Sequence, residues 1–479
     1  MHRSRRALMA VVVLVACFSA GAAQAVPNFA RKYDLNCNVC HTREPRLNPF
    51  GQRFQENGYQ LPGTEDGGVT KKQMFGGLAL DSVSNMFSAR IRADIQQASF
   101  KEKTEATDDV DFVVPNIMNL FVAGTANKNV GYFFEVEYAP GEGHAELIFE
   151  RIFVVFSNIG NRHQALNVKI GEFDPSAYFA FPTHRQQMNP IFPDAHTEDF
   201  PPEINRIPIL PLAFSSKMFG LTTGPHNEEE DGFSILPFEP YLYNSPAALG
   251  IAVYGRPAGE NFFYQIGLVQ EETAEDEPET RYDYHVTLRY DLPMGKNRAS
   301  QIAGFYYHAP DAARPTLAPM GNLFFAPTVD WDRYGIGARM QHKMIDVYAT
   351  VIWDEIDQPM FAGPPLSLSK WDTDGMGASL EIDWLKSEKW LFAARYDYMD
   401  PGGLVELPGP LQMGDPAINQ EASFIGLIAK HYPATNIGLY ARCHFNLNGS
   451  VELPRALGGG IHPARNLESV IAVGIDMAF

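Results

Sequence analysis

Regular alternation of apolar and polar residues is the feature that most constrains how this chain can fold. Between residues 87 and 96 every odd-numbered residue is apolar, whereas the even-numbered ones are Ser88, Arg90, Arg92, Asp94 and Gln96. The same period of two returns over 283–292 and 390–398. A period of two is typical of β-strands that face a polar environment on one side and an apolar environment on the other. The chain is therefore expected to be mainly β.

Alternating strands occur in soluble β proteins and in transmembrane barrels, and the connections between the strands favour the second class. Short connections at 126–129 and 387–389 join strands tightly. Long Pro-, Gly- or Asp-rich connections follow at about 173–214, 224–246, 309–331, 355–375, 400–420 and 448–467. Short periplasmic turns and long extracellular loops are typical of outer-membrane barrels. The alternation alone does not show which face of each strand points inward.

The end of the chain also indicates an outer-membrane protein. Alternate apolar positions there are Ile471, Val473, Ile475, Met477 and Phe479. A terminal aromatic residue on such a strand resembles the assembly signal of bacterial outer-membrane proteins. We count about sixteen candidate strands between residues 85 and 479, with 214–243 ambiguous. We predict an antiparallel outer-membrane β-barrel over 85–479, with a lumen wide enough for a channel or a small plug.

Composition excludes several other classes of protein. The mean hydropathy is −0.19, too polar for a bundle of membrane helices. The net charge is −19, with 38 basic against 57 acidic residues, which argues against nucleic-acid binding. Four cysteines in 479 residues exclude a disulfide scaffold.

Residues 1–25 are predicted to be an export signal. An arginine-containing start precedes an apolar stretch over 7–18, and a small-x-small cleavage pattern ends at Ala25. The pair Arg5-Arg6 faintly resembles a twin-arginine signal, but doubled arginines are common in ordinary secretory signals, which we favour. The mature chain then keeps three of the four cysteines.

The sharpest chemical signal is the sequence Cys-x-x-Cys-His formed by Cys37, Cys40 and His41. This is the attachment pattern of c-type haem, in which two thiols about one helical turn apart form thioethers to the vinyl groups and the imidazole binds the iron. A thioredoxin-like pair would need a βαβ context, and a zinc site would need two further ligands nearby; the sequence shows neither. We predict one covalent haem c, attached through Cys37 and Cys40, with His41 as the proximal iron ligand.

The sixth iron ligand is less clearly indicated. Met74 and Met86 are the only Met or His residues between His41 and residue 100. Met74 follows a Gly-rich turn that could fold the chain back over the haem, so it is our first candidate for the distal ligand. Met86, a histidine of the barrel, or an open position are the alternatives. Cys443 lies on the apolar face of the stretch 437–445, and we expect it to be a buried small hydrophobe.

The residues around the haem motif resemble a known family. The segment 26–31, the motif itself, the segment 45–54 and Asn57-Gly58-Tyr59 are similar to the head of fused monohaem cytochrome–porins of bacterial outer membranes. That group includes Fe(II) oxidases, and the resemblance covers about residues 26–60. It implies a small α-helical cytochrome c head, which we assign to 26–75, joined to a porin-like barrel, with extracellular Fe(II) as the electron donor.

Together, these features suggest an electron-transfer protein that carries electrons across the outer membrane to a soluble periplasmic cytochrome or a similar carrier. The barrel would be surrounded by outer-membrane lipid. The alternatives are a cytochrome that conducts electrons outward to extracellular acceptors, a passive porin with a haem-bearing plug or redox gate, and a soluble periplasmic haem enzyme. Acidic runs at 228–231 and 271–279 could gather cations at a loop mouth, although solvated loops explain them more simply. The sequence indicates no catalytic residue beyond the haem site.

Overall fold

The computed structural model describes most of the predicted strands and the region around the haem motif. The described residues are 28–43, 46–61, 72–75, 78–80, 85–100, 110–140, 145–161, 163–179, 248–257, 261–270, 282–293, 300–313, 328–357, 370–371, 375–400, 404–406, 422–448 and 467–479. The predicted export signal, the ambiguous stretch 214–243 and both acidic runs lie outside them.

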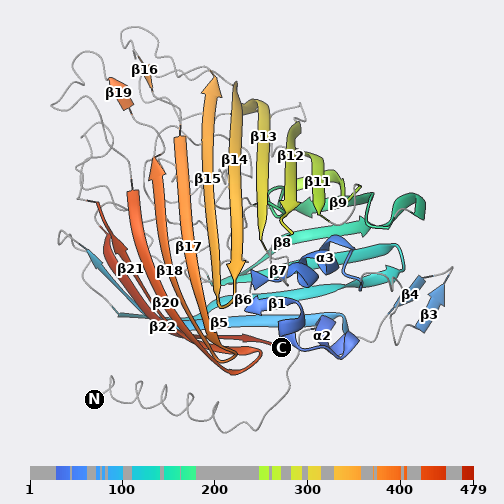
Figure 1. Ribbon diagram of the computed structural model, residues 1–479, viewed down its shortest axis with the longest axis horizontal. Helices are drawn as coiled ribbons and strands as arrows, with labels where there is room; N and C mark the ends of the chain where they lie inside the picture. The colour runs from blue at the N-terminus through green and yellow to red at the C-terminus, as the bar shows by residue number, and fades with distance from the viewer. Residues whose placement is uncertain are drawn as a thin grey trace.

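Sixteen antiparallel strands form a closed barrel (Figure 1). Their bounds are β5 (Phe87–Phe100), β6 (Val110–Asn127), β7 (Val130–Pro140), β8 (Ala145–Phe156), β9 (Asn167–Phe173), β10 (Ala248–Gly255), β11 (Phe262–Gln270), β12 (Tyr282–Asp291), β13 (Gln301–Ala313), β14 (Thr328–His342), β15 (Ile345–Asp357), β17 (Gly375–Ser387), β18 (Trp390–Asp400), β20 (Ala422–Ala434), β21 (Ile437–Asn446) and β22 (Leu467–Ala478). Each strand pairs with the next along the chain, and β22 closes the ring by pairing with β5. The predicted count of about sixteen strands is confirmed.

The tightest connections of the barrel lie together at one end. Only two residues separate β6 from β7 and β17 from β18, which confirms the predicted turns at 126–129 and 387–389. The backbone N–H of Phe479 donates to the carbonyl of Ala89 at 2.9 Å, so the C-terminus lies where β5 begins. We call this end of the barrel, which carries the short turns, the short-turn end.

The barrel is polar inside and apolar outside. In β12 the residues Asp283, His285, Thr287, Arg289 and Asp291 are buried. The intervening apolar residues point outward, with Leu288 47% and Tyr290 46% exposed. A soluble barrel has the reverse arrangement, because apolar side chains fill its interior, whereas a transmembrane barrel shows its apolar face to lipid. The structure thus shows which face of each strand points into the barrel, which the alternation in the sequence did not.

The N-terminal head is made of short elements. These are α2 (Asn28–Tyr33), the 3-10 turn η1 (Cys37–Val39), β1 (His41–Arg43), β2 (Arg46–Leu47) and α3 (Pro49–Glu56). The side chain of Asn48 caps α3 by accepting a hydrogen bond from the N–H of Gly51 at 2.9 Å, and Pro49 occupies the first helical position. The expected α-helical head is not confirmed, because α2 and α3 are short and β1 and β2 lie between them. Pro49 disfavours helical backbone at Asn48, so α3 begins as a separate element after β2.

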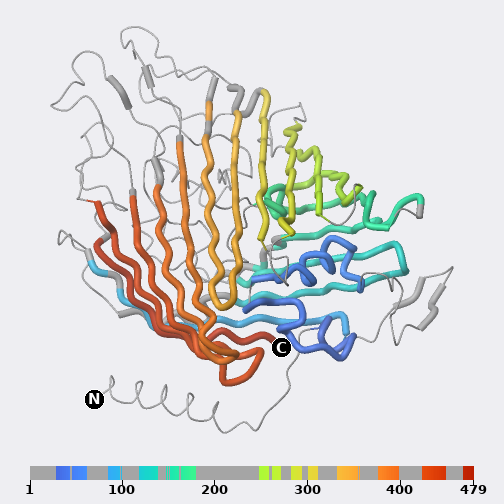
Figure 2. The backbone as a smooth tube through the Cα atoms, viewed as in Figure 1, coloured from blue at the N-terminus to red at the C-terminus, as the bar shows by residue number. Residues whose placement is uncertain are grey.

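The head lies inside the short-turn end of the barrel, and we call residues 28–43 and 46–61 the plug. In Figures 1 and 2 the plug, in blue, lies beside the strands β5 to β8. The side-chain amide of Asn28 donates to the Ala123 carbonyl of β6 at 3.0 Å, and Lys32 Nζ donates to the Thr125 hydroxyl at 3.3 Å. These contacts join the start of the plug to the wall.

Buried ion pairs attach the plug to the opposite part of the wall. Arg46 hydrogen-bonds the carboxylates of Glu381 and Asp383 on β17. Arg339 of β14 donates to the carbonyl of Leu47 at 2.8 Å. Because buried charges are costly without partners, these bonds favour one position of the plug in the lumen.

Glu56, at the end of α3, makes a second buried anchor. It accepts a hydrogen bond from Arg256 at 2.8 Å and another from Arg289 of β12. Burial alone would raise the pKa of the Glu56 carboxyl, but the charges of Arg256 and Arg289 outweigh it and lower that pKa to about 2. The carboxyl is therefore ionised at neutral pH.

An inner segment, residues 174–179, turns from the end of β9 into the lumen. Gln265 donates to the Pro175 carbonyl at 3.2 Å, and the ring of Phe179 stacks on Phe305 of β13 with centroids 5.2 Å apart. Gly335 on β14 makes this approach feasible, because a Cβ there would lie 2.5 Å from the Phe179 ring. Plug and inner segment thus both occupy the lumen.

Two further two-stranded sheets are separate from the barrel sheet. They are β3 (Lys72–Phe75) with β4 (Leu78–Leu80), and β16 (Lys370–Trp371) with β19 (Leu404–Glu406). In the described part of the chain, no helix is long and apolar enough to cross a membrane.

Candidate functional site

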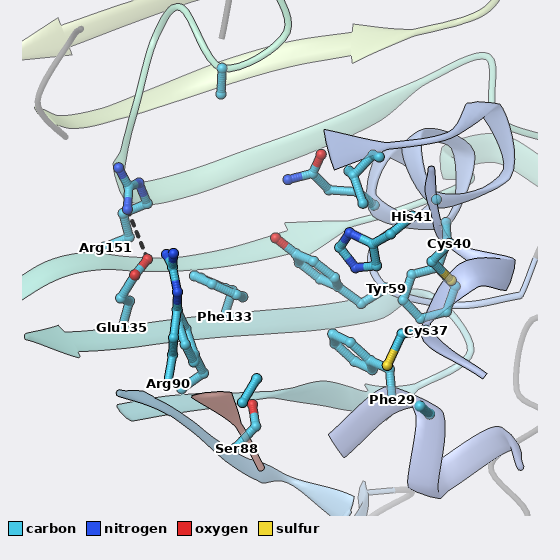
Figure 3. A pocket seen from close by; sticks show the side chains of 18 of the residues that line it. Phe29, Cys37, Cys40, His41, Tyr59, Ser88, Arg90, Phe133, Glu135 and Arg151 are labelled. Atoms are coloured by element: carbon cyan, nitrogen blue, oxygen red, sulfur yellow. Dashed lines mark hydrogen bonds and ion pairs between the residues drawn. The ribbon is translucent and has the colours of Figure 1, made fainter. Parts of the chain in front are cut away.

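A cavity of about 360 Å³ lies between the plug, the barrel wall and the inner segment (Figure 3). The plug contributes Cys37, Cys40 and His41 to its lining. The wall contributes residues of β5, β6, β7, β8, β9 and β22, and the inner segment contributes Asp174 and Ala177. Cavities of roughly 300–1,000 Å³ are of the size that proteins use for drug-sized ligands and cofactors.

The motif residues converge at one end of this cavity. η1 places the two cysteines together, with the N–H of Cys40 donating to the Cys37 carbonyl at 3.1 Å, and His41 follows as the first residue of β1. Asn48 donates to the Val39 carbonyl at 2.8 Å, which holds the loop of the motif against the start of α3. Figure 3 shows the three side chains on the same side of the cavity.

The two cysteines are free thiols, and Cys37 is buried. Burial raises the pKa of the Cys40 thiol to about 11, so this thiol is protonated at neutral pH. Both cysteines line the cavity, so both thiols face the space in which a bound group would lie.

Aromatic rings form one wall of the cavity. Phe29 stacks on Tyr59, Tyr59 on Phe133 of β7, and Phe133 on Phe153 of β8, and in each pair the centroids are 5.4 Å apart. Such a wall suits a large, flat and mostly apolar group. Phe133 and Phe153 were not among the residues that we predicted for the site. The sequence indicates them in one way. Both are aromatic residues at inward-facing positions, where most strands of this barrel carry polar residues.

Charged residues line the other end of the cavity. Arg90 of β5 donates to both carboxylate oxygens of Asp476 on β22, at 2.9 and 2.6 Å. Arg151 of β8 donates to Glu135 of β7 at 2.8 Å. The pairing of β7 with β8 shifts between Glu135 and Val136, and such bulges commonly redirect side chains beside functional sites. Sequence reasoning placed Arg90 on the polar face of its strand but did not connect it with the haem motif.

Neither candidate for the distal iron ligand is among the described residues that line the cavity. Met74 lies in β3, and its side chain is outside the description. The carbonyl of Met86 accepts a hydrogen bond from Asn28 at 3.4 Å, but Met86 does not line the cavity. Among the described lining residues, His41 is the only histidine. In the same part of the chain no group of three His, Cys, Asp or Glu side chains is arranged to bind a metal ion. The distal assignment to Met74 stays a prediction.

Cys443 lies away from the site. It is on the apolar face of β21, as predicted, but it is only half-buried. The expectation of a buried residue is wrong because the apolar face of this barrel points outward rather than into a core.

Comparisons with known proteins give no family for the chain. No family model matches it, and no curated protein matches it. Among solved structures, it is similar to Salmonella typhi OmpF in complex with daunomycin, with a TM-score of 0.47 and 10% identity over 84% of this chain and 98% of that one. An anion-selective porin from Comamonas acidovorans gives a TM-score of 0.47 and 13% identity over 82% and 98%. OmpT of Vibrio cholerae gives a TM-score of 0.44 and 10% identity over 85% of this chain and 99% of that one. The barrel described above rests on the pairing of this chain's own strands.

Proposed function

We propose that this protein is an outer-membrane c-type cytochrome in which a β-barrel holds a monohaem plug and carries electrons across the membrane. The observation that carries the proposal is the convergence of Cys37, Cys40 and His41 on one cavity inside the barrel. The resemblance of residues 26–60 to fused monohaem cytochrome–porins supports it. The predicted export signal supports a location beyond the inner membrane.

The outer surface of the barrel supports a place in a membrane. Its strands expose apolar side chains, and Trp384, Trp390 and Phe392 gather on the outer wall at the β17–β18 turn. Lys386 lies 5.8 Å above the rings of Trp384 and Phe392. Aromatic residues with a cationic neighbour are typical of the level where lipid headgroups begin. The polar lumen is then the part shielded from lipid.

The residues of the cavity fit a c-type haem. Cys37 and Cys40 would hold the group covalently, and His41 would bind the iron from the proximal side. The aromatic wall with Tyr59 and Phe133 would exclude water from one side of the group. When bound, haem supplies a one-electron centre whose potential depends on its axial ligands and its surroundings.

Extracellular Fe(II) as the donor and a soluble periplasmic cytochrome or similar carrier as the acceptor belong to the same proposal. Their support is the family resemblance. The position of the plug agrees with them, because the short turns of outer-membrane barrels face the periplasm, where a carrier would approach. A cytochrome that conducts electrons outward would use the same site with the opposite direction of flow.

Mixing purified oxidised protein with anaerobic Fe(II) tests the donor directly. We expect the haem absorption spectrum to change to that of the reduced form, at near-neutral or acidic pH. A haem that stays fully oxidised with stoichiometric Fe(II) at both pH values would remove Fe(II) as donor. The outward-conducting cytochrome would then become the leading hypothesis.

A passive porin with a haem-bearing plug is the second candidate. The observation that favours it is the closed barrel of sixteen strands with a polar lumen, the architecture of diffusion channels. The electron-carrying cytochrome and the passive porin would have the same barrel. The barrel alone supports the passive porin at least as well as it supports the cytochrome. Solute flux into liposomes distinguishes them. A passive porin admits small sugars at a high rate, whereas an electron conduit closed by its plug admits few.

A further inference from the structure

The cavity has two chemically different ends, and this difference bears on how a haem would lie in it. Figure 3 shows Cys37, Cys40 and His41 on one side, Arg90 and Glu135 with Arg151 on the other, and the rings of Tyr59 and Phe133 between them. Haem has a corresponding polarity. Its two vinyl groups lie toward one edge of the macrocycle, and its two propionate carboxylates lie at the opposite edge.

Covalent attachment would fix the orientation of the group. Thioethers from Cys37 and Cys40 keep the vinyl edge beside η1, so the propionate edge points away from η1, toward the charged end. Carboxylates placed in a partly buried cavity need charged or hydrogen-bonding partners. Arginine supplies a planar set of donors that matches a carboxylate.

From this arrangement, we propose that Arg90 and Arg151 bind the two haem propionates, an inference that rests on the proposed function. The two arginines come from different strands, β5 and β8, and both line the cavity. Arg151 is 11% exposed and its partner Glu135 is 5% exposed, whereas Arg90 and Asp476 are 23% and 21% exposed. The site thus has one largely buried arginine and one more accessible arginine, each already oriented by a carboxylate of a neighbouring strand.

The neighbouring acids explain how the arginines keep their positions. Glu135 also accepts a hydrogen bond from Asn119 at 3.3 Å, and Asp476 accepts two from Arg90. Lys169 is a third cation in the lining, but it donates to the Tyr178 hydroxyl at 3.2 Å and lies 4.9 Å from the centre of the Phe153 ring. We assign Lys169 to the aromatic wall rather than to the propionates.

The inference has a measurable consequence for the redox potential. Reduction adds an electron to the haem, so nearby positive charge favours the reduced form. Replacing Arg90 or Arg151 by a neutral residue should therefore lower the midpoint potential. It should also change the propionate bending bands of the resonance Raman spectrum, because those bands respond to the hydrogen bonds that the carboxylates accept.

The experiment compares Arg90→Gln and Arg151→Gln with Arg90→Lys, Arg151→Lys and a control, in the full-length protein in detergent. The control is Arg442→Gln, which removes a lumen arginine that lies 3.5 Å from Asp94 and does not line the cavity. Haem staining after denaturing electrophoresis reports covalent attachment, and the different migration of unboiled and boiled samples reports folding. Midpoint potentials and Raman spectra are then measured on the folded proteins.

We expect both Gln variants to keep the haem stain, to have lower potentials and to show shifted propionate bands. The Lys variants should have midpoint potentials close to that of the parent, because lysine keeps the positive charge. Their propionate bands should still be shifted, because lysine lacks the planar set of donors. The control should match the parent. Potentials and bands unchanged in either Gln variant would overturn the assignment of that arginine, as would a lower potential with unchanged bands. If a Gln variant fails to fold, the corresponding Lys variant tests the assignment of that arginine: shifted propionate bands support it, and unchanged bands overturn it. A parent protein without covalent haem would instead refute the proposed function.

Discussion

Two thiols of the plug are the residues on which covalent attachment of haem depends. Replacing both Cys37 and Cys40 by Ser removes both attachment points, so we expect no haem stain after denaturing electrophoresis. Each single replacement should weaken the stain, because one thioether remains available. The matched control is Cys443→Ser, which alters a half-buried thiol on the outer wall and should leave the stain at the parent level. Full staining of the double variant would disprove attachment at this motif.

The iron ligands make a second prediction. Loss of the imidazole in His41→Ala should change the visible spectrum and the potential of any haem that remains attached. Met74→Ala should lower the potential and alter the spectrum if its thioether is the distal ligand, whereas Met86→Ala should change neither. Identical spectra for Met74→Ala and the parent would exclude Met74 and leave another ligand or an open position.

Residues of the site were predictable from sequence only where their relation is local. Cys37, Cys40 and His41 lie within five positions, so their spacing alone indicates their chemistry. Phe133, Arg151 and Arg90 come from separate strands, and only the closed barrel brings them to the plug. Phe133 could have been suspected from the sequence, because it is an aromatic residue at an inward-facing position.

At the scale of elements, strands were easier to predict than the plug. The alternation in β5, β12 and β18 follows directly from a wall with one polar and one apolar side, and each of these strands is confirmed. Strand ends were less accurate: the expected connection 309–331 is shorter, since β13 continues to Ala313 and β14 begins at Thr328. The plug lacks such a period; only α3 has a local signal, the Asn48 cap followed by Pro49, and the contacts that place the plug in the lumen come from distant strands.

The Glu56 anchor predicts a pH dependence of the plug. Its pKa in the folded protein, about 2, lies below the usual value near 4.3 of a free glutamate. Its contribution to plug stability is therefore complete above about pH 4.3 and is lost as the pH falls toward 2. We expect the plug to become more accessible to an acid-stable protease over this interval.

The variant Glu56→Gln should show increased cleavage already at neutral pH, because it leaves Arg256 and Arg289 buried without their carboxylate. Breaking one partner of a buried pair costs roughly 3–5 kcal/mol. The control is Glu388→Gln, in the exposed β17–β18 turn. Equal protection of all three proteins at every pH would show that this ion pair does not hold the plug.

At the scale of the whole molecule, the inverted polarity of the barrel predicts its behaviour in membranes. We expect the protein in the outer-membrane fraction, with mainly β circular dichroism and with different migration of unboiled and boiled samples on gels. Recovery wholly in the soluble periplasmic fraction would contradict the assignment to the membrane.

A haem plug that carries electrons across the barrel must also transfer them across the membrane of a sealed liposome. The parent and the Cys37→Ser/Cys40→Ser variant are reconstituted into liposomes that enclose an oxidised soluble cytochrome c, and anaerobic Fe(II) is added outside. We expect reduction of the enclosed cytochrome with the parent and only the background rate with the variant, which differs from it only in the two thiols. Equal reduction with both proteins would show that Fe(II) passes through an open pore, and no reduction with the parent would show that the plug does not conduct; either result would contradict the claim.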